Sequence, residues 1–157
     1  MKKTILALVM FMFFAPAFAQ ESSDDIRIIQ SIYGKEKRDL VGQFLALSPE
    51  DLAKFAPIYD AYEVERKEIA KQRLENIAEY ILVYGTADEK EIDKLTLNNL
   101  KLNSHSDKMM AKYYAKVKKA VGTKNAAKFF QIENYLALSV RMSIWDNIPF
   151  LDELDNK

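Results

Sequence analysis

The feature that most constrains the fold is one continuous helical pattern between Ser48 and Gly85. Ser48-Pro49-Glu50-Asp51 is typical of a helix start, because serine caps a free N–H, proline suits the first position and the acids face the positive end of the helix dipole. Gly85 is typical of a left-handed helix end. About 36 helical residues predict a rod about 54 Å long, in which Pro57 is expected to remove one backbone hydrogen bond. Apolar side chains at spacings of three and four form one stripe, namely Phe55, Tyr59, Tyr62, Ile69, Ile77, Tyr80 and Tyr84.

A second long helix follows directly. Thr86 is the predicted N-cap, with acids in the first turn, and Gly122 is the predicted stop. Because the connection at Gly85 is short, the two helices are expected to be antiparallel neighbours. The inner face of the second helix is predicted to consist of Ile92, Leu95, Leu102, Met109, Tyr113, Val117 and Val121.

Two shorter helices are expected on either side of this hairpin. The first covers residues 26–47, is interrupted near Gly34, and the last runs from Thr123 to Trp145 before Pro149. The core side chains of the last helix are predicted to be Ala126, Ala127, Phe130, Tyr135, Leu138 and Met142. The predicted fold is therefore all-α: a long antiparallel helical hairpin completed by two shorter helices, like a four-helix bundle with a projecting tip. Residues 20–150 are expected to form a single domain, and residues 151–157 an acidic tail.

The first 19 residues have the pattern of a signal peptide rather than of a folded element. Lys2 and Lys3 precede an apolar run from Thr4 to Phe14, and Ala17-Phe18-Ala19 resembles a cleavage site. The apolar run is short for a bilayer span, so no membrane span is expected in the mature protein. The predicted location is a bacterial periplasm.

Composition and charge exclude several function classes. The chain has 23 basic and 23 acidic residues, so removal of the two leader lysines leaves 21 against 23, a net charge near −2. Nucleic-acid binding needs a basic face and is not expected. The absence of cysteine excludes disulfides and thiol chemistry. His105 is the single histidine, and no nucleophile motif or phosphate-binding glycine loop is present, so we predict no enzyme, no catalytic residues, no metal site and no cofactor.

The hairpin is predicted to have apolar ends and a polar waist. The waist pairs residues 63–73, which are mostly charged, with residues 98–107, which are rich in Asn and Ser. At the tip, residues 80–84 are apolar on every side, more than two helices can bury, and an exposed apolar patch commonly marks a partner surface. The alternative is that the first helix extends far enough to cover the tip. The predicted partner-binding residues are Tyr80, Ile81, Val83, Tyr84, Met109, Met110 and Tyr113, and the expected occupant is another copy of the chain, forming a homodimer, or another protein.

A basic stripe follows the second long helix. Its members recur at four, four and three residues: Lys108, Lys112, Lys116 and Lys119. It is either a solvated face near the negative helix end or a surface that attracts acidic partners.

The start of the main helix also resembles a known family. A leader, long helices and Leu47-Ser48-Pro49-Glu50-Asp51 resemble the LTxxQ-motif family of periplasmic proteins, which includes Spy-like chaperones, Cpx-type envelope-stress inhibitors and zinc-resistance-associated proteins. Ser48 stands in place of the family's Thr, and Asp51 in place of its Gln. The resemblance implies a helical hairpin, often dimeric, that binds clients without ATP.

With this resemblance, two functions stay open. One is a periplasmic, ATP-independent chaperone-like protein that binds unfolded or envelope proteins through apolar helical surfaces. The other is a non-catalytic regulatory or adaptor protein of the envelope-stress response that docks to one specific partner.

The leader makes a first prediction. In a bacterial host we expect export and cleavage before Gln20, so the intact mass of the periplasmic protein should equal that of residues 20–157. Ala19→Leu should block cleavage because a small side chain is required there, whereas Phe18→Leu, at the tolerant middle position, should be processed normally. A periplasmic protein that retains residues 1–19 would contradict the prediction.

Overall fold

The computed structural model describes residues 37, 40–86 and 88–151, and every regular element in these ranges is an α-helix. The chain divides into two compact units, residues 1–39 and 40–157. The second unit contains helical residues 40–45, α2 (Pro49–Val83) and α3 (Glu89–Trp145). The all-α class is thus confirmed. The leader, the expected helix around residues 26–36 and the tail beyond 151 lie outside the described residues.

Helix α2 begins as its sequence predicts. Ser48 is the N-cap, and its Oγ accepts a hydrogen bond from the Asp51 N–H at 3.2 Å. The helix continues through Pro57. The predicted role of Gly85 is wrong, because Gly122 is the glycine with positive φ among the described residues. The end of α2 needs no left-handed residue, since the Tyr84 and Thr86 N–H groups donate to the carbonyls of Tyr80 and Val83 in right-handed geometry.

The start of α3 differs by two residues from the prediction. Its N-cap is Asp88, whose Oδ1 accepts from the Glu91 N–H at 2.9 Å. The Thr86 hydroxyl instead donates back to the Val83 carbonyl at 3.4 Å. A carboxylate at the cap also favours the positive end of the dipole, which explains why Asp88 takes this position.

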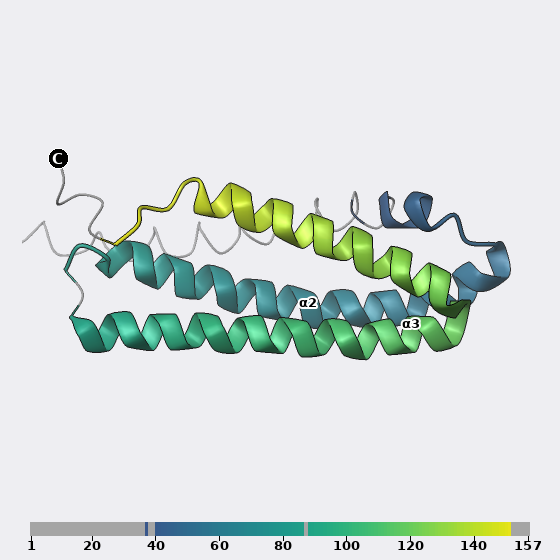
Figure 1. The fold of residues 1–157 in the computed structure, drawn as a ribbon, viewed down its shortest axis with the longest axis horizontal. Helices are drawn as coiled ribbons and strands as arrows, with labels where there is room; N and C mark the ends of the chain where they lie inside the picture. Colours follow the sequence, from purple (N-terminus) through teal and green to yellow (C-terminus); the bar gives the residue numbers. More distant parts are fainter. Residues whose placement is uncertain (1–36, 38–39, 87, 152–157) are drawn as a thin grey trace, which may run out of the picture. The chain divides into compact units, whose positions relative to one another are not determined.

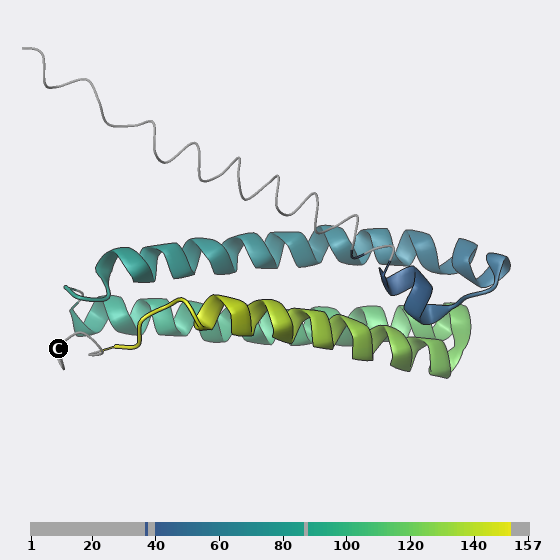
Figure 2. The same cartoon turned by 90° about the horizontal axis from the view of Figure 1, so that it is seen from above.

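Gly122 divides α3 into two arms. Its φ of 85° and ψ of 165° are not helical, and this conformation favours glycine because it has no Cβ. We call residues 89–121 the outgoing arm and residues 123–145 the return arm. Figure 1 and Figure 2 show α2 running beside the outgoing arm, and the return arm doubling back beside them after the bend. The predicted interruption at Gly122 is therefore confirmed.

Aromatic rings from α2 and from the return arm form the centre of the core. The Phe129 side chain is fully buried, and its ring lies edge-on to Phe55, Tyr59 and Tyr62 at centroid distances of 5.9, 6.4 and 5.2 Å. The outgoing arm contributes the face that was predicted: Leu95, Leu102, Met109, Tyr113, Val117 and Val121 are buried.

The return arm, by contrast, buries a different face from the predicted one. Ala126, Phe129 and Glu133 are its buried residues. Of the predicted core side chains only Ala126 is buried; Phe130, Tyr135, Leu138 and Met142 are 43%, 66%, 49% and 61% exposed. Both sets recur at helical spacing, so periodicity alone could not choose between them. The arm therefore carries one apolar face in the core and a second on the surface.

The connection before α2 makes a second prediction. Ala46 is exposed and has a φ of 47°, where a Cβ is unfavourable. We expect Ala46→Gly to raise the free energy of unfolding by about 0.5–1 kcal/mol, the relief of strain exceeding the entropy cost of glycine. Ala53→Gly, at an exposed position within α2, is the matched control and should lower it by about 1 kcal/mol. Urea denaturation of both variants is the measurement, and equal destabilisation by both would contradict the prediction.

Candidate functional site

The predicted tip residues are partly covered. Ile81 is 46% exposed, whereas Tyr80, Val83 and Tyr84 are half-buried. The Tyr80 hydroxyl donates to the Pro149 carbonyl at 3.0 Å, and the neighbouring Ile148 is buried. The tip is therefore not formed by two helices alone, because Pro149, which follows the return arm, contacts Tyr80 of α2 there.

The other predicted partner-binding residues lie elsewhere. Met109 and Tyr113 are only 3% and 4% exposed and belong to the core, and Met110 packs against it. Tyr113 also donates its hydroxyl proton to the Ala61 carbonyl at 3.0 Å. These three side chains hold α2 to the outgoing arm, so they offer little surface to a partner in this conformation.

The polar waist is present between α2 and the outgoing arm. Arg73 Nη1 donates to the side-chain oxygens of Asn99 and Asn103 at 3.1 and 2.8 Å. Burial lowers the pKa of Arg73, and the positive charge of Arg141 on the return arm lowers it further.

Two members of the basic stripe are engaged within the chain. Lys112 donates to Glu65 at 2.7 Å, and the Nζ of Lys116 lies 4.9 Å from the centroid of the Tyr113 ring. The single histidine, His105, is exposed, with its Nε2 3.9 Å from a Glu65 oxygen. These contacts favour the solvated-face interpretation of the stripe.

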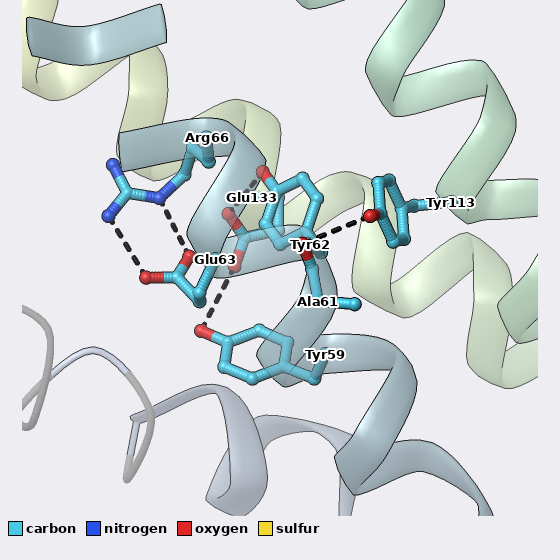
Figure 3. Close-up of polar contacts among 7 residues, drawn as sticks. All are labelled: Tyr59, Ala61, Tyr62, Glu63, Arg66, Tyr113 and Glu133. Carbon is cyan, nitrogen blue, oxygen red and sulfur yellow. Dashed lines mark hydrogen bonds and ion pairs between the residues drawn. The ribbon is translucent and has the colours of Figure 1, made fainter. Parts of the chain in front are cut away.

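A cluster of tyrosines and carboxylates lies inside the bundle (Figure 3). Glu133 of the return arm is 1% exposed, and it accepts hydrogen bonds from the hydroxyls of Tyr62 at 2.7 Å and Tyr59 at 3.4 Å. One turn further along α2, Arg66 forms two hydrogen bonds with Glu63 at 2.7 and 2.9 Å. Paired donors and acceptors of this kind make the burial of charged groups tolerable.

The electrostatics of the cluster follow from burial and from the charge of Glu133. Burial raises the pKa of Tyr62 and of Tyr59 strongly, and the negative charge of Glu133 raises both further. Burial alone would lower the pKa of Arg66, but its hydrogen bonds to Glu63 and the negative charges of Glu63 and Glu133 together outweigh this and raise it. The two tyrosines therefore remain neutral donors, which suits them to hold a carboxylate.

The sequence pattern did not identify Glu133 as a buried residue. The available signal was its spacing, since Ala126, Phe129 and Glu133 lie three and four residues apart and so share one helix face. A charged residue on an apolar face was not expected, because isolated buried carboxylates are costly.

The cluster positions the return arm rather than offering an accessible site. Because Glu133 is held by two tyrosines of α2, the arm has one preferred rotation about its axis. That rotation directs Tyr135, Leu138, Met142 and Trp145 to solvent, where they are 66%, 49%, 61% and 44% exposed. We call these four residues the exposed stripe. Their spacing of three, four and three is the heptad spacing of a helix that packs on another helix.

Two other kinds of site are absent from the described residues. In the part of the chain that the structure describes, no three His, Cys, Asp or Glu side chains lie close enough together to hold a metal ion. Within the same residues, neither the length nor the apolar character of any helix suffices to cross a membrane.

Comparison of the chain with protein-family models, with curated proteins and with solved structures finds no match.

The buried tyrosines make a third prediction, on alkaline pH. The folded state keeps protons on Tyr59 and Tyr62 that the unfolded chain releases above about pH 10, so the stabilisation is complete below that pH and decreases as pH rises above it. Each tyrosine should contribute a loss of about 1.4 kcal/mol in the free energy of unfolding per pH unit. Tyr62→Phe should remove one such contribution between about pH 10.5 and 12.

Denaturant titrations at a series of pH values measure this slope. Tyr135→Phe is the matched control, because the Tyr135 side chain is mostly in solvent, and it should leave the slope unchanged. Equal slopes for the native chain and Tyr62→Phe would overturn the assignment.

Proposed function

We propose that this protein is an exported, periplasmic, ATP-independent chaperone-like protein that binds unfolded or envelope proteins and carries out no catalysis. The observation that supports it most directly is the exposed stripe on the return arm. Four large apolar side chains lie on one helix face in contact with water. A partner that covers them lowers the free energy by about 25 cal/mol per Å² of apolar surface buried. The proposal retains the expected fold of residues 20–150, a long hairpin completed by two shorter helices.

The composition of the exposed stripe suits clients of varied sequence. Met142 has a flexible, polarisable side chain that adapts to irregular surfaces. Tyr135 and Trp145 combine a large apolar ring with a polar group that can remain in water. Leu138 completes an apolar strip that an extended or helical client segment can contact along its length.

Charged residues beside the stripe keep such a surface in solution. Lys128 and Arg141 lie on the return arm among the apolar side chains, and Asp146 follows directly after Trp145. Mixed charge around an apolar strip opposes non-specific association of the free protein.

The start of α2 supplies a second line of support. Leu47-Ser48-Pro49-Glu50-Asp51 resembles the motif of the LTxxQ family, and Ser48 of this segment is the N-cap of α2. Membership of that family, and the periplasmic location that the leader predicts, remain part of the proposal.

An aggregation assay tests the proposed function as the fourth prediction. The mature chain should suppress light scattering by several unrelated unfolded proteins, without ATP and at similar molar ratios. Met142→Glu should raise the ratio required by about tenfold, since it replaces a contact worth about 1.5–3 kcal/mol with a charge. Val64→Glu is the matched control, because Val64 is 73% exposed on α2, away from the stripe, and it should have no effect.

Two outcomes would count against the chaperone. An equal loss of aggregation suppression in both variants would show that added negative charge, and not the exposed stripe, controls client binding. No suppression of any client, together with stable co-purification of one envelope protein, would instead support the adaptor function.

A further inference from the structure

The charges of the return arm lie at the wrong ends for a helix on its own. Lys124 lies in its first turn, near the positive end of the helix dipole, and Lys128 follows in the second turn. Asp146 is its C-cap, at the negative end, and the last turn contains no basic residue. Lys124 and Asp146 are therefore placed where the dipole disfavours them.

No contact within the described chain offsets this placement. Among the ion pairs within residues 40–86 and 88–151, none includes Lys124, Lys128 or Asp146. An antiparallel helix lying on the exposed stripe would supply opposite charges at both ends.

The return arm itself has the required pattern. Its outward face carries one residue every three or four positions: Lys124, Lys128, Gln131, Tyr135, Leu138, Met142 and Trp145. This is a seven-residue repeat maintained over three repeats, about six turns, basic at its start and apolar towards its end. A second copy of the same face in the opposite direction places the basic start of each copy on the acidic end of the other.

We propose that two copies of this chain associate through the exposed stripe, with their return arms antiparallel and related by a two-fold axis. In the register that sets Lys128 beside Asp146 of the second copy, Tyr135 and Leu138 of each copy meet near the axis. Trp145 then lies against the stem and ammonium group of Lys128, a cation–π arrangement. The contact extends over about 27 Å of each arm.

Parallel pairing is disfavoured by the same charges. It would place Lys124 and Lys128 of one copy beside the same two lysines of the other, and Asp146 beside Asp146. In the antiparallel arrangement, two-fold symmetry makes the contact of Lys128 with Asp146 occur twice, so its favourable contribution counts double.

Self-association would affect the proposed function. The effect on client binding rests on that function, whereas the dimer itself does not. A dimer formed in this way covers the surface that clients would contact, so client binding requires dissociation. The association state is measured without any client, which separates failure of the dimer from failure of the chaperone.

A charge exchange tests the interface, as the fifth prediction. Sedimentation equilibrium of the mature chain should show a monomer–dimer equilibrium. Lys128→Glu and Asp146→Lys should each raise the dimer dissociation constant by about tenfold, because each turns two attractions into two repulsions. The double variant should return it to near the native value.

Unfolding cannot account for weaker association in these variants. Each single change places a charge that the helix dipole favours, so the return arm itself should be at least as stable. Circular dichroism and thermal unfolding of the variants check this point directly.

Cross-linking tests the antiparallel orientation, and the absence of natural cysteine makes single-cysteine variants clean. Leu138→Cys lies near the axis and should be joined to its own copy by a short bis-maleimide. Lys124→Cys should not, because the two copies of that position would be about 38 Å apart along the arms.

Three results would overturn the proposal. A native chain that stays monomeric at all concentrations would exclude the dimer, and efficient cross-linking through residue 124 would show parallel pairing. A dimer that neither charge change weakens would place the interface on another surface.

Discussion

The hydrogen bond from Tyr62 to Glu133, 2.7 Å long and buried, is the contact on which the rest of the arrangement depends. It joins the middle of α2 to the middle of the return arm across 71 residues of chain. With Tyr59 also donating to Glu133, turning the arm about its axis would break both hydrogen bonds to this carboxylate, each worth about 1.5–3 kcal/mol. The Phe129 ring, packed edge-on between the rings of α2, favours the same rotation.

A helix with two apolar faces needs a contact that determines which face is buried. The return arm could bury the face of Phe129 or the face of Leu138, and hydrophobic burial by itself does not distinguish them strongly. A polar contact is directional, so it selects one face and leaves the other in solvent. The exposed stripe is thus a consequence of the buried cluster, and the surface we propose for partners depends on a carboxylate that no partner touches.

The sequence predicted local features of the structure better than features that depend on distant parts of the chain. The Ser48 cap involves residues three apart, and the inner face of the outgoing arm repeats one strong pattern, so both were predicted correctly. Gly85 and Thr86 were assigned roles by residue type, but the turn between α2 and α3 closes through backbone bonds and an Asp88 cap. Competing signals two residues apart cannot be ranked from preferences of a few tenths of a kcal/mol. The contact between Pro149 and Tyr80 was not predicted for another reason: whether the chain beyond the return arm reaches the tip depends on the length and direction of that arm.

The sequence by itself determined that this chain is helical, where α2 begins, that the chain bends at Gly122 and which face of the outgoing arm is buried. Each of these features depends on residues within a few positions of one another, because helix caps and side-chain periodicity are set by neighbours along the chain. Only the tertiary structure decided which face of the return arm meets the core and which remains outside. That choice depends on hydroxyl groups of α2 and a carboxylate far along the chain, whose meeting no local pattern specifies.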